Sequence, residues 1–155
     1  MPFSSPLPYI KQISLYLKSD DYAQACPLAK EFAKKFPDEM FSHLFLAKTL
    51  MGIGKIQEAE SEASQAFQLS RGPEQVIFSG ILLSCIYYQE EKYPQGKRIL
   101  DSLRKDFPER MEIEKLQFIF AMSLRDAEGA ADHLIEIYQI DWKTGQEIAE
   151  LFLKE

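Results

Sequence analysis

The chain has 155 residues, of which 46% are hydrophobic, 27% charged and 12% aromatic. This composition suits a folded domain with its own core and argues against global disorder. Lys and Arg number 18 and Asp and Glu number 24, which gives a net charge of -6. Because binding to phosphate backbones needs an excess of cations, no nucleic acid is expected among the partners. The segment from Met111 to Glu155 has four basic and ten acidic residues, which predicts a solvated flank or a basic partner there.

The two cysteines and the N-terminal segment indicate a cellular setting. Cys26 and Cys85 lack the paired spacing of a disulfide framework or a zinc site, so a reduced, cytoplasmic location is expected. The first eight residues have no basic region followed by an apolar core, and no secretory signal is expected. The longest uncharged run, residues 75–89, is too short and too polar to span a bilayer. The sequence therefore predicts no membrane span.

Apolar residues recur at helical spacing along the chain, and no segment alternates with the period of a strand. We therefore expect an all-α fold. Pro2, Pro6 and Pro8 should keep the first residues out of a helix, so that the first helix spans about 9–18. The second helix is expected to begin at Tyr22 and to end before Pro37, and the third to end at the glycines at 52 and 54. Further helices are expected over about 56–69 and 75–89, from 93–94 to Pro108, and over about 112–124, 127–140 and 143–153. In the last of these, Ile148, Leu151 and Phe152 should be buried on one side.

These helices repeat as pairs. Small residues at Ala25, Ala59, Gly96 and Ala130 are spaced by 34, 37 and 34 positions. The same register aligns Gln12, Leu46, Leu83 and Gln117 in the first helix of each pair. The three extra residues of the middle unit are assigned to a loop at 70–74, where changes in length cost least.

The pattern resembles the tetratricopeptide repeat, a 34-residue pair of antiparallel helices. The second unit shows the family's large, Leu, small, large, turn and Ala positions best, at His43, Leu46, Ala47, Leu50, Gly54 and Ala59. The resemblance implies a right-handed superhelix of about four repeats, over about 6–38, 39–74, 75–109 and 110–141, followed by a C-terminal capping helix. Residues 1–155 are expected to form a single domain of this type. Units one and four fit less well, as terminal repeats of solenoids commonly do.

No motif predicts catalysis or a cofactor. The segment Gly52–Lys55 lacks the upstream glycine and the final Ser or Thr of a phosphate loop, which favours a turn between helices. His43 and His133 are 90 residues apart without metal-ligand spacing, and we interpret them as surface or groove histidines. An enzyme, a metal site and a cofactor are therefore not expected.

Other reactive side chains also have a simpler interpretation. Cys26 and Cys85 lie in no nucleophile motif and are interpreted as buried small hydrophobic residues. Glu58, Glu60 and Glu62 are interpreted as part of a solvated helix face.

In tetratricopeptide repeat proteins the first helices of successive repeats line a concave groove that receives a peptide or helix. Carried over to this chain, the resemblance implies a mostly apolar groove at Phe41, Leu44, Lys48, Met51, Phe78, Ile81, Cys85, Tyr88, Lys115, Ile119 and Met122, with Leu7, Ile10, Ser14, Leu17 and Glu112 at the equivalent places in units one and four. The chain has no asparagine, so the carboxylate clamp of some relatives is not expected. The lining favours an apolar or amphipathic peptide partner. Alternatively, these side chains pack against each other or under the C-terminal helix.

Two functions remain open at this stage. The first is an adaptor or scaffold that assembles a protein complex through its groove. The second is a small acidic chaperone for a secreted or membrane-inserting client, because secretion chaperones with this repeat are similar in size and charge. Rescue of an aggregation-prone client on co-expression would distinguish the two.

Overall fold

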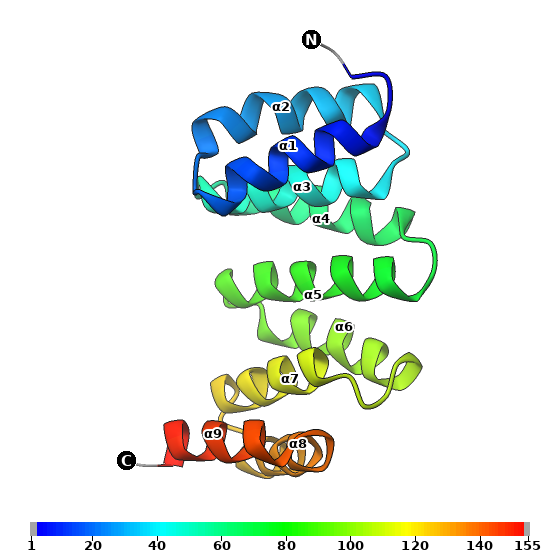
Figure 1. The fold of residues 1–155 in the computed structure, drawn as a ribbon. Helices are drawn as coiled ribbons and strands as arrows, with labels where there is room; N and C mark the ends of the chain where they lie inside the picture. Colours follow the sequence, from blue (N-terminus) through cyan, green and yellow to red (C-terminus); the bar gives the residue numbers. More distant parts are fainter. Residues whose placement is uncertain (1–2, 154–155) are drawn as a thin grey trace. The chain divides into compact units, whose positions relative to one another are not determined.

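The computed structural model describes residues 3–153, whose regular structure consists of nine helices and no strand (Figure 1). The helices are α1 (Pro6–Lys18), α2 (Tyr22–Lys35), α3 (Met40–Gly52), α4 (Ile56–Leu69), α5 (Pro73–Gln89), α6 (Tyr93–Asp106), α7 (Met111–Ser123), α8 (Ala127–Ile140) and α9 (Trp142–Leu153). The predicted all-α fold of paired antiparallel helices is confirmed.

Local signals in the sequence explain where several helices begin and end. The Asp21 carboxylate accepts a hydrogen bond from the backbone N–H of Gln24 at 3.3 Å, as an N-cap residue does. Gly54, with φ of 83°, follows α3 and turns the chain toward α4. Gly72, with φ of 81°, similarly precedes α5. Both glycines adopt a left-handed backbone conformation that a side chain would disfavour.

The start of α1 differs from the prediction. Pro6 and Pro8 lie inside the first turn of the helix rather than before it. Backbone N–H groups in a first turn have no partner within the helix, so proline costs little there and its fixed φ suits the conformation. The helix therefore begins three residues before the predicted Tyr9.

The three extra residues of the middle repeat lengthen a helix. The prediction that they lie in a loop at 70–74 is therefore wrong. The first helices of the other repeats, α1, α3 and α7, have 13 residues each, whereas α5 has 17. The loop before α5, residues 70–72, is one residue shorter than the loop before α3, residues 36–39. Ser70 closes this short loop by hydrogen bonding to the Ser79 hydroxyl at 2.7 Å and to the Gln75 carbonyl at 3.2 Å.

The described chain forms two compact units, the first ending at Glu90 and the second beginning at Glu91. In the first unit α1 packs against α2, α2 against α3, α3 against α4, and α4 against α5. In the second unit α6 packs against α7, α7 against α8, and α8 against α9. The boundary falls within the third predicted repeat. The single domain and its superhelical path stay predictions.

Small and aromatic side chains fill the interior of the first unit. Ala25 and Ala29 on α2 are fully buried, as are Ala59, Ala63 and Ala66 on α4, and their size lets the helix axes approach closely. Tyr9 and Phe32 stack with ring centroids 4.9 Å apart. These contacts join α1 to α2 at the N-terminal end of the fold.

The second unit has its own apolar cluster of Phe118, Ala121, Ala130 and Ile137. Ile148 of α9 packs against this cluster, as predicted. Leu151 does not, because its side chain is 74% exposed, and the prediction that it is buried is wrong. Leu151 lies nearly one helical turn after Ile148, and its side chain is outside the part of the α9 surface that packs against α8. The side chain of Phe152 lies outside the described residues.

Both histidines contact a glutamate on a neighbouring helix. His133 is 8% exposed, so its interpretation as a surface or groove residue is wrong, whereas His43 is partly exposed. The His43 Nδ1 atom lies 2.6 Å from Glu62 Oε2, and its Nε2 atom lies 2.7 Å from the Pro37 carbonyl oxygen. The His133 Nδ1 atom lies 2.9 Å from Glu114 Oε2. Glu62 consequently belongs to an interhelical contact rather than to a purely solvated face.

The two histidine–glutamate pairs occupy equivalent positions of the second and fourth repeats. His43 and Glu114 each lie three residues before the aligned positions 46 and 117. Glu62 and His133 each lie three residues after the aligned small residues at 59 and 130. The two repeats thus make the same contact between first and second helix with histidine and glutamate exchanged.

Candidate functional site

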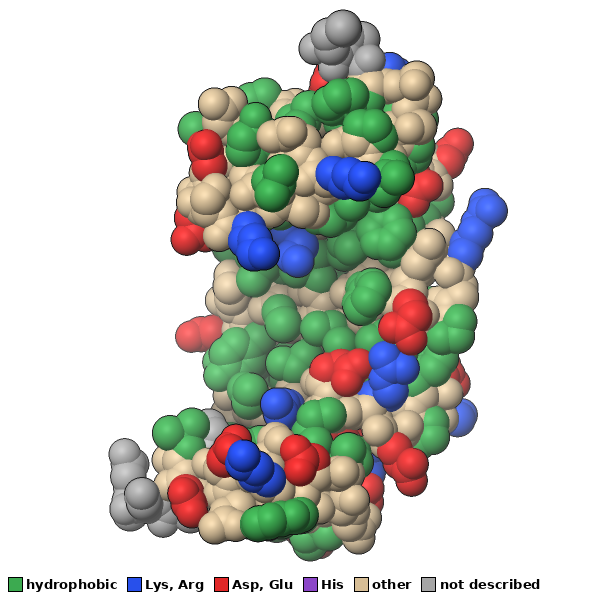
Figure 2. Space-filling model, in the orientation of Figure 1, with side chains coloured by type: hydrophobic (Ala, Val, Ile, Leu, Met, Phe, Trp, Pro, Cys, Tyr) green, Lys and Arg blue, Asp and Glu red, His purple; other side chains and the backbone are tan. Residues whose placement is uncertain are grey.

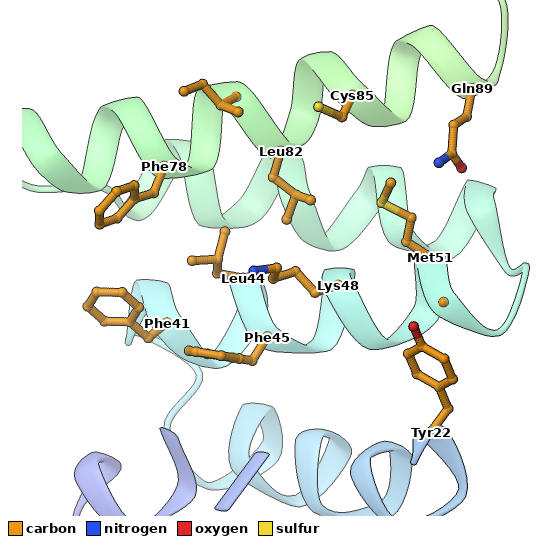
Figure 3. Close-up of a pocket in the computed structure, with 12 residues that line it drawn as sticks. Tyr22, Phe41, Leu44, Phe45, Lys48, Met51, Phe78, Leu82, Cys85 and Gln89 are labelled. Carbon is orange, nitrogen blue, oxygen red and sulfur yellow. The ribbon is translucent and has the colours of Figure 1, made fainter. Parts of the chain in front are cut away.

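A cavity of about 710 Å³ opens in the first unit between α3 and α5 (Figure 3). It is lined by Tyr22 from α2, by Phe41, Leu44, Phe45, Lys48, Met51 and Gly52 from α3, and by Phe78, Ile81, Leu82, Cys85 and Gln89 from α5. Figure 2 shows hydrophobic side chains gathered over α3 and α5, with basic side chains beside them. Among the described lining residues Lys48 is the single charged one, so the cavity is an apolar site with one cation.

Most residues assigned to the groove in the first unit line this cavity together. They are Phe41, Leu44, Lys48, Met51, Phe78, Ile81 and Cys85. Tyr88 lies near the end of α5 and is not part of the lining. That these residues bind a partner stays a prediction.

The remaining predicted groove residues lie on α7, in the second compact unit. Lys115 is exposed there, and Met122 is 42% exposed. Ile119 packs against the apolar cluster of that unit and contributes to its core. Their membership of a partner-binding groove stays a prediction.

Some lining residues were not predicted from the sequence. Phe45 and Leu82 occupy the same place in the second and third repeats, one residue before Leu46 and Leu83. Applying the repeat register to this additional position would have found both. The groove positions that the family resemblance implies include only some of the residues of α3 and α5 that line the cavity.

Tyr22 is a further unpredicted lining residue, and Gly52 explains its position. A Cβ atom on Gly52 would lie 2.1 Å from the Tyr22 Cε1 atom, so only glycine leaves room for the ring. Figure 3 shows the Tyr22 ring at the Met51 end of the cavity. The sequence had indicated Gly52 only as a helix terminator.

The lining combines a buried floor with an exposed rim. Leu44 is 7% exposed and belongs to a core cluster with Met40 and Ala66. Phe41 is partly buried and packs against that cluster, whereas Phe78 is 49% exposed. Leu44 is thus part of the core under the cavity, while Phe78 leaves apolar surface uncovered.

Cys85 and Tyr22 of the lining favour their neutral forms. Burial raises the pKa of the Cys85 thiol, so a reactive thiolate is disfavoured. Loss of water contact, and next the Asp20 carboxylate, raise the pKa of Tyr22, whose hydroxyl donates to Asp20 at 3.3 Å. Cys85 is partly buried rather than fully buried as predicted, and so is Cys26. The site is thus suited to apolar contact.

A smaller cavity of about 380 Å³ shares part of this lining. Ser14, Leu17 and Lys18 of α1 line it with Tyr22, Phe45 and Lys48. The two cavities have the last three residues in common. We call the surface that they form together, from α1 across α3 to α5, the α1–α3–α5 face. No group of His, Cys, Asp and Glu within residues 3–153 could hold a metal ion, and none of the helices described there is long and apolar enough to cross a membrane.

Comparison with known proteins gives the fold. No protein-family model matches the sequence, and no curated protein matches it significantly. Among solved structures, MamA from Desulfovibrio magneticus RS-1 is similar, with a TM-score of 0.74 and 12% identity over 91% of this chain and 78% of that chain. A crystal structure of MamA protein has a TM-score of 0.71 and 15% identity, over 87% and 72% of the two chains.

A third similar chain occurs in the structure of Naa15/Naa10 bound to HypK-THB. Its TM-score is 0.69 with 16% identity. The match covers 94% of this chain but only 22% of that longer chain. Identities this low indicate the fold and no more. Together with the helix pairs and their 34-residue register, the likenesses show a tetratricopeptide-repeat type of helical fold.

Proposed function

We propose that the chain is a protein-interaction module, an adaptor or scaffold, which binds an apolar or amphipathic peptide segment between α3 and α5. The observation that carries this proposal is the uncovered aromatic surface of the cavity. Phe78 on α5 faces the part of α3 that carries Phe41 and Phe45 (Figure 3). The ring centroids of Phe41 and Phe45 lie 6.4 Å apart, and all three aromatic side chains line the cavity.

The size and chemistry of the cavity suit a peptide. Its volume of about 710 Å³ falls within the range typical of ligand sites, roughly 300–1,000 Å³. An amphipathic helix presents apolar anchors three or four residues apart, and these could enter between α3 and α5. Met51 adds an unbranched side chain that adapts to different apolar surfaces.

Similar structures are consistent with binding to proteins. The structure of Naa15/Naa10 bound to HypK-THB is a protein complex that contains a chain of similar fold. This supports a protein partner here without indicating which one. The absence of a nucleic-acid partner and the cytoplasmic location stay predictions.

Substituting Phe78 with glutamate should abolish partner capture while leaving helix content and the melting temperature nearly unchanged. The side chain is 49% exposed, so the free protein tolerates a charge at this position. The same charge disfavours binding of an apolar side chain of the partner. We expect at least about tenfold less partner, since aromatic anchors at the centre of interfaces dominate the binding energy. The measurement is affinity purification from the native organism, followed by quantitative mass spectrometry.

The matched control is Ile135→Glu. Ile135 is 54% exposed on α8 and does not line the cavity, so this substitution places the same new charge on a similarly exposed apolar side chain. This variant should capture the partner as the unmodified chain does. Equal capture by the Phe78 variant, or equal loss in both variants, would contradict the proposed site.

A small acidic chaperone for a secreted or membrane-inserting client is the second candidate. Apolar side chains exposed outside the cavity favour it, such as Trp142 at 66% and Leu151 at 74%, because a chaperone covers apolar client surface at several points. Co-expression with an aggregation-prone client distinguishes the candidates. A chaperone keeps the client soluble, whereas an adaptor forms a complex of fixed stoichiometry with a partner that is stable alone.

A further inference from the structure

We propose that the segment bound on the α1–α3–α5 face carries acidic side chains next to its apolar anchors. This inference rests on the proposed function and specifies the partner's chemistry. It follows from the distribution of charge around the two cavities.

The α1–α3–α5 face is basic although the chain as a whole is acidic. Lys48 lines both cavities and Lys18 lines the smaller one. None of the described lining residues of either cavity is Asp or Glu, although the chain has 24 acidic residues. The Asp20 carboxylate accepts a hydrogen bond from Tyr22 beside the site but lines neither cavity.

The two lysines are available for a partner's carboxylates. Neither Lys18 nor Lys48 forms an ion pair with any residue in the described range 3–153. Other cations of the chain do, such as Lys97 with Asp101 at 3.0 Å and Arg104 with Glu114 at 2.6 Å. Figure 3 shows the Lys48 side chain beside Leu44 within the cavity.

The free energy of removing water from the Lys48 ammonium group differs between possible partners. An entirely apolar segment would remove water from the Lys48 ammonium group without replacing its hydrogen bonds, which disfavours binding. A basic segment would add repulsion in a partly desolvated site, where charges are screened less than in bulk water. An acidic side chain next to the apolar anchors would pair with the lysine, and a second carboxylate could reach Lys18.

The test uses a displayed library of random peptides about 16 residues long, roughly four helical turns, selected on the immobilised full chain. Selected peptides should be enriched in Asp and Glu as well as in apolar residues. A synthetic copy of a selected peptide should bind the Lys18→Glu/Lys48→Glu variant about five- to fiftyfold more weakly. Binding to the unmodified chain should also weaken between about 50 and about 300 mM salt, as screening increases.

The control is Lys30→Glu, on the exposed face of α2 and outside both cavities. It makes the same kind of charge change and should alter affinity less than about threefold. Lys48→Gln removes one charge without adding another and should give an intermediate loss of affinity. It tests the same charge if the double variant does not fold.

Two results would overturn the inference in distinguishable ways. Selected peptides that depend on Phe78 but show no acidic enrichment, or bind the lysine variants unchanged, would refute the charge assignment and leave the proposed function standing. A library without any peptide that depends on Phe78 would refute the proposed function, and the charge assignment with it.

Discussion

Replacement of Leu83 by alanine is expected to lower the free energy of unfolding by about 2–5 kcal/mol. Leu83 lies on α5, is aligned with Leu46 by the internal repeat and is 3% exposed. Truncation removes buried apolar surface and leaves a cavity that neighbouring helices fill only in part. Thermal and denaturant unfolding, followed by circular dichroism, would measure the loss.

Leu15→Ala is the control for this prediction. Leu15 is 61% exposed on α1, so the same truncation should change stability by less than about 0.5 kcal/mol. Leu50→Ala, at the buried position of α3 with 2% exposure, should resemble Leu83→Ala. A small loss in both buried variants would show that Leu50 and Leu83 do not set the helix packing.

Replacement of Glu114 by alanine should cost about 2–4 kcal/mol. The Glu114 side chain is 2% exposed, and its two oxygens contact Arg104 Nε at 2.6 Å and His133 Nδ1 at 2.9 Å. The substitution breaks both contacts and leaves His133 buried without its acceptor. The loss should stay below that of a wholly buried ion pair because the Arg104 side chain is 41% exposed and can regain water.

Glu112→Ala provides the matched comparison two residues away in the same helix. Glu112 pairs with Arg110 at 3.0 Å, but the two side chains are 44% and 35% exposed, and such pairs contribute less than about 1 kcal/mol. Glu114→Gln, which keeps the size and one acceptor, should fall between the two alanine variants. Equal stability of the Glu112 and Glu114 alanine variants would mean that the buried carboxylate does not hold α7 to α6 and α8.

Helices were predictable from the sequence where local signals determine their ends. The bounds of α4 and α8 agree with the expected ranges, since the repeat period and the preceding turns both mark them. The start of α1 was missed because proline both excludes a helix interior and suits a first turn. The long α5 was missed because three added residues give the same repeat spacing whether they extend a loop or a helix.

The contacts of side chains were less predictable than their helical faces. Periodicity places Leu44 and Phe78 on one surface, but only the packing of α3 and α5 makes one a buried floor and the other an exposed rim. The exchanged His43 and Glu114 did carry a usable signal. Complementary residues at equivalent positions of two repeats indicate a contact even where each residue alone looks like a surface group.

The most direct test of the central claim, that a partner segment occupies the cavity between α3 and α5, uses the two native cysteines. Cys85 lines the cavity, whereas Cys26 lies on α2 outside both cavities. Alkylation by a small maleimide would be followed by mass spectrometry with and without a peptide selected on the full chain. The account predicts that saturating peptide slows alkylation of Cys85 by at least about tenfold and leaves Cys26 unchanged. Unchanged alkylation of Cys85 in the saturated complex would contradict it.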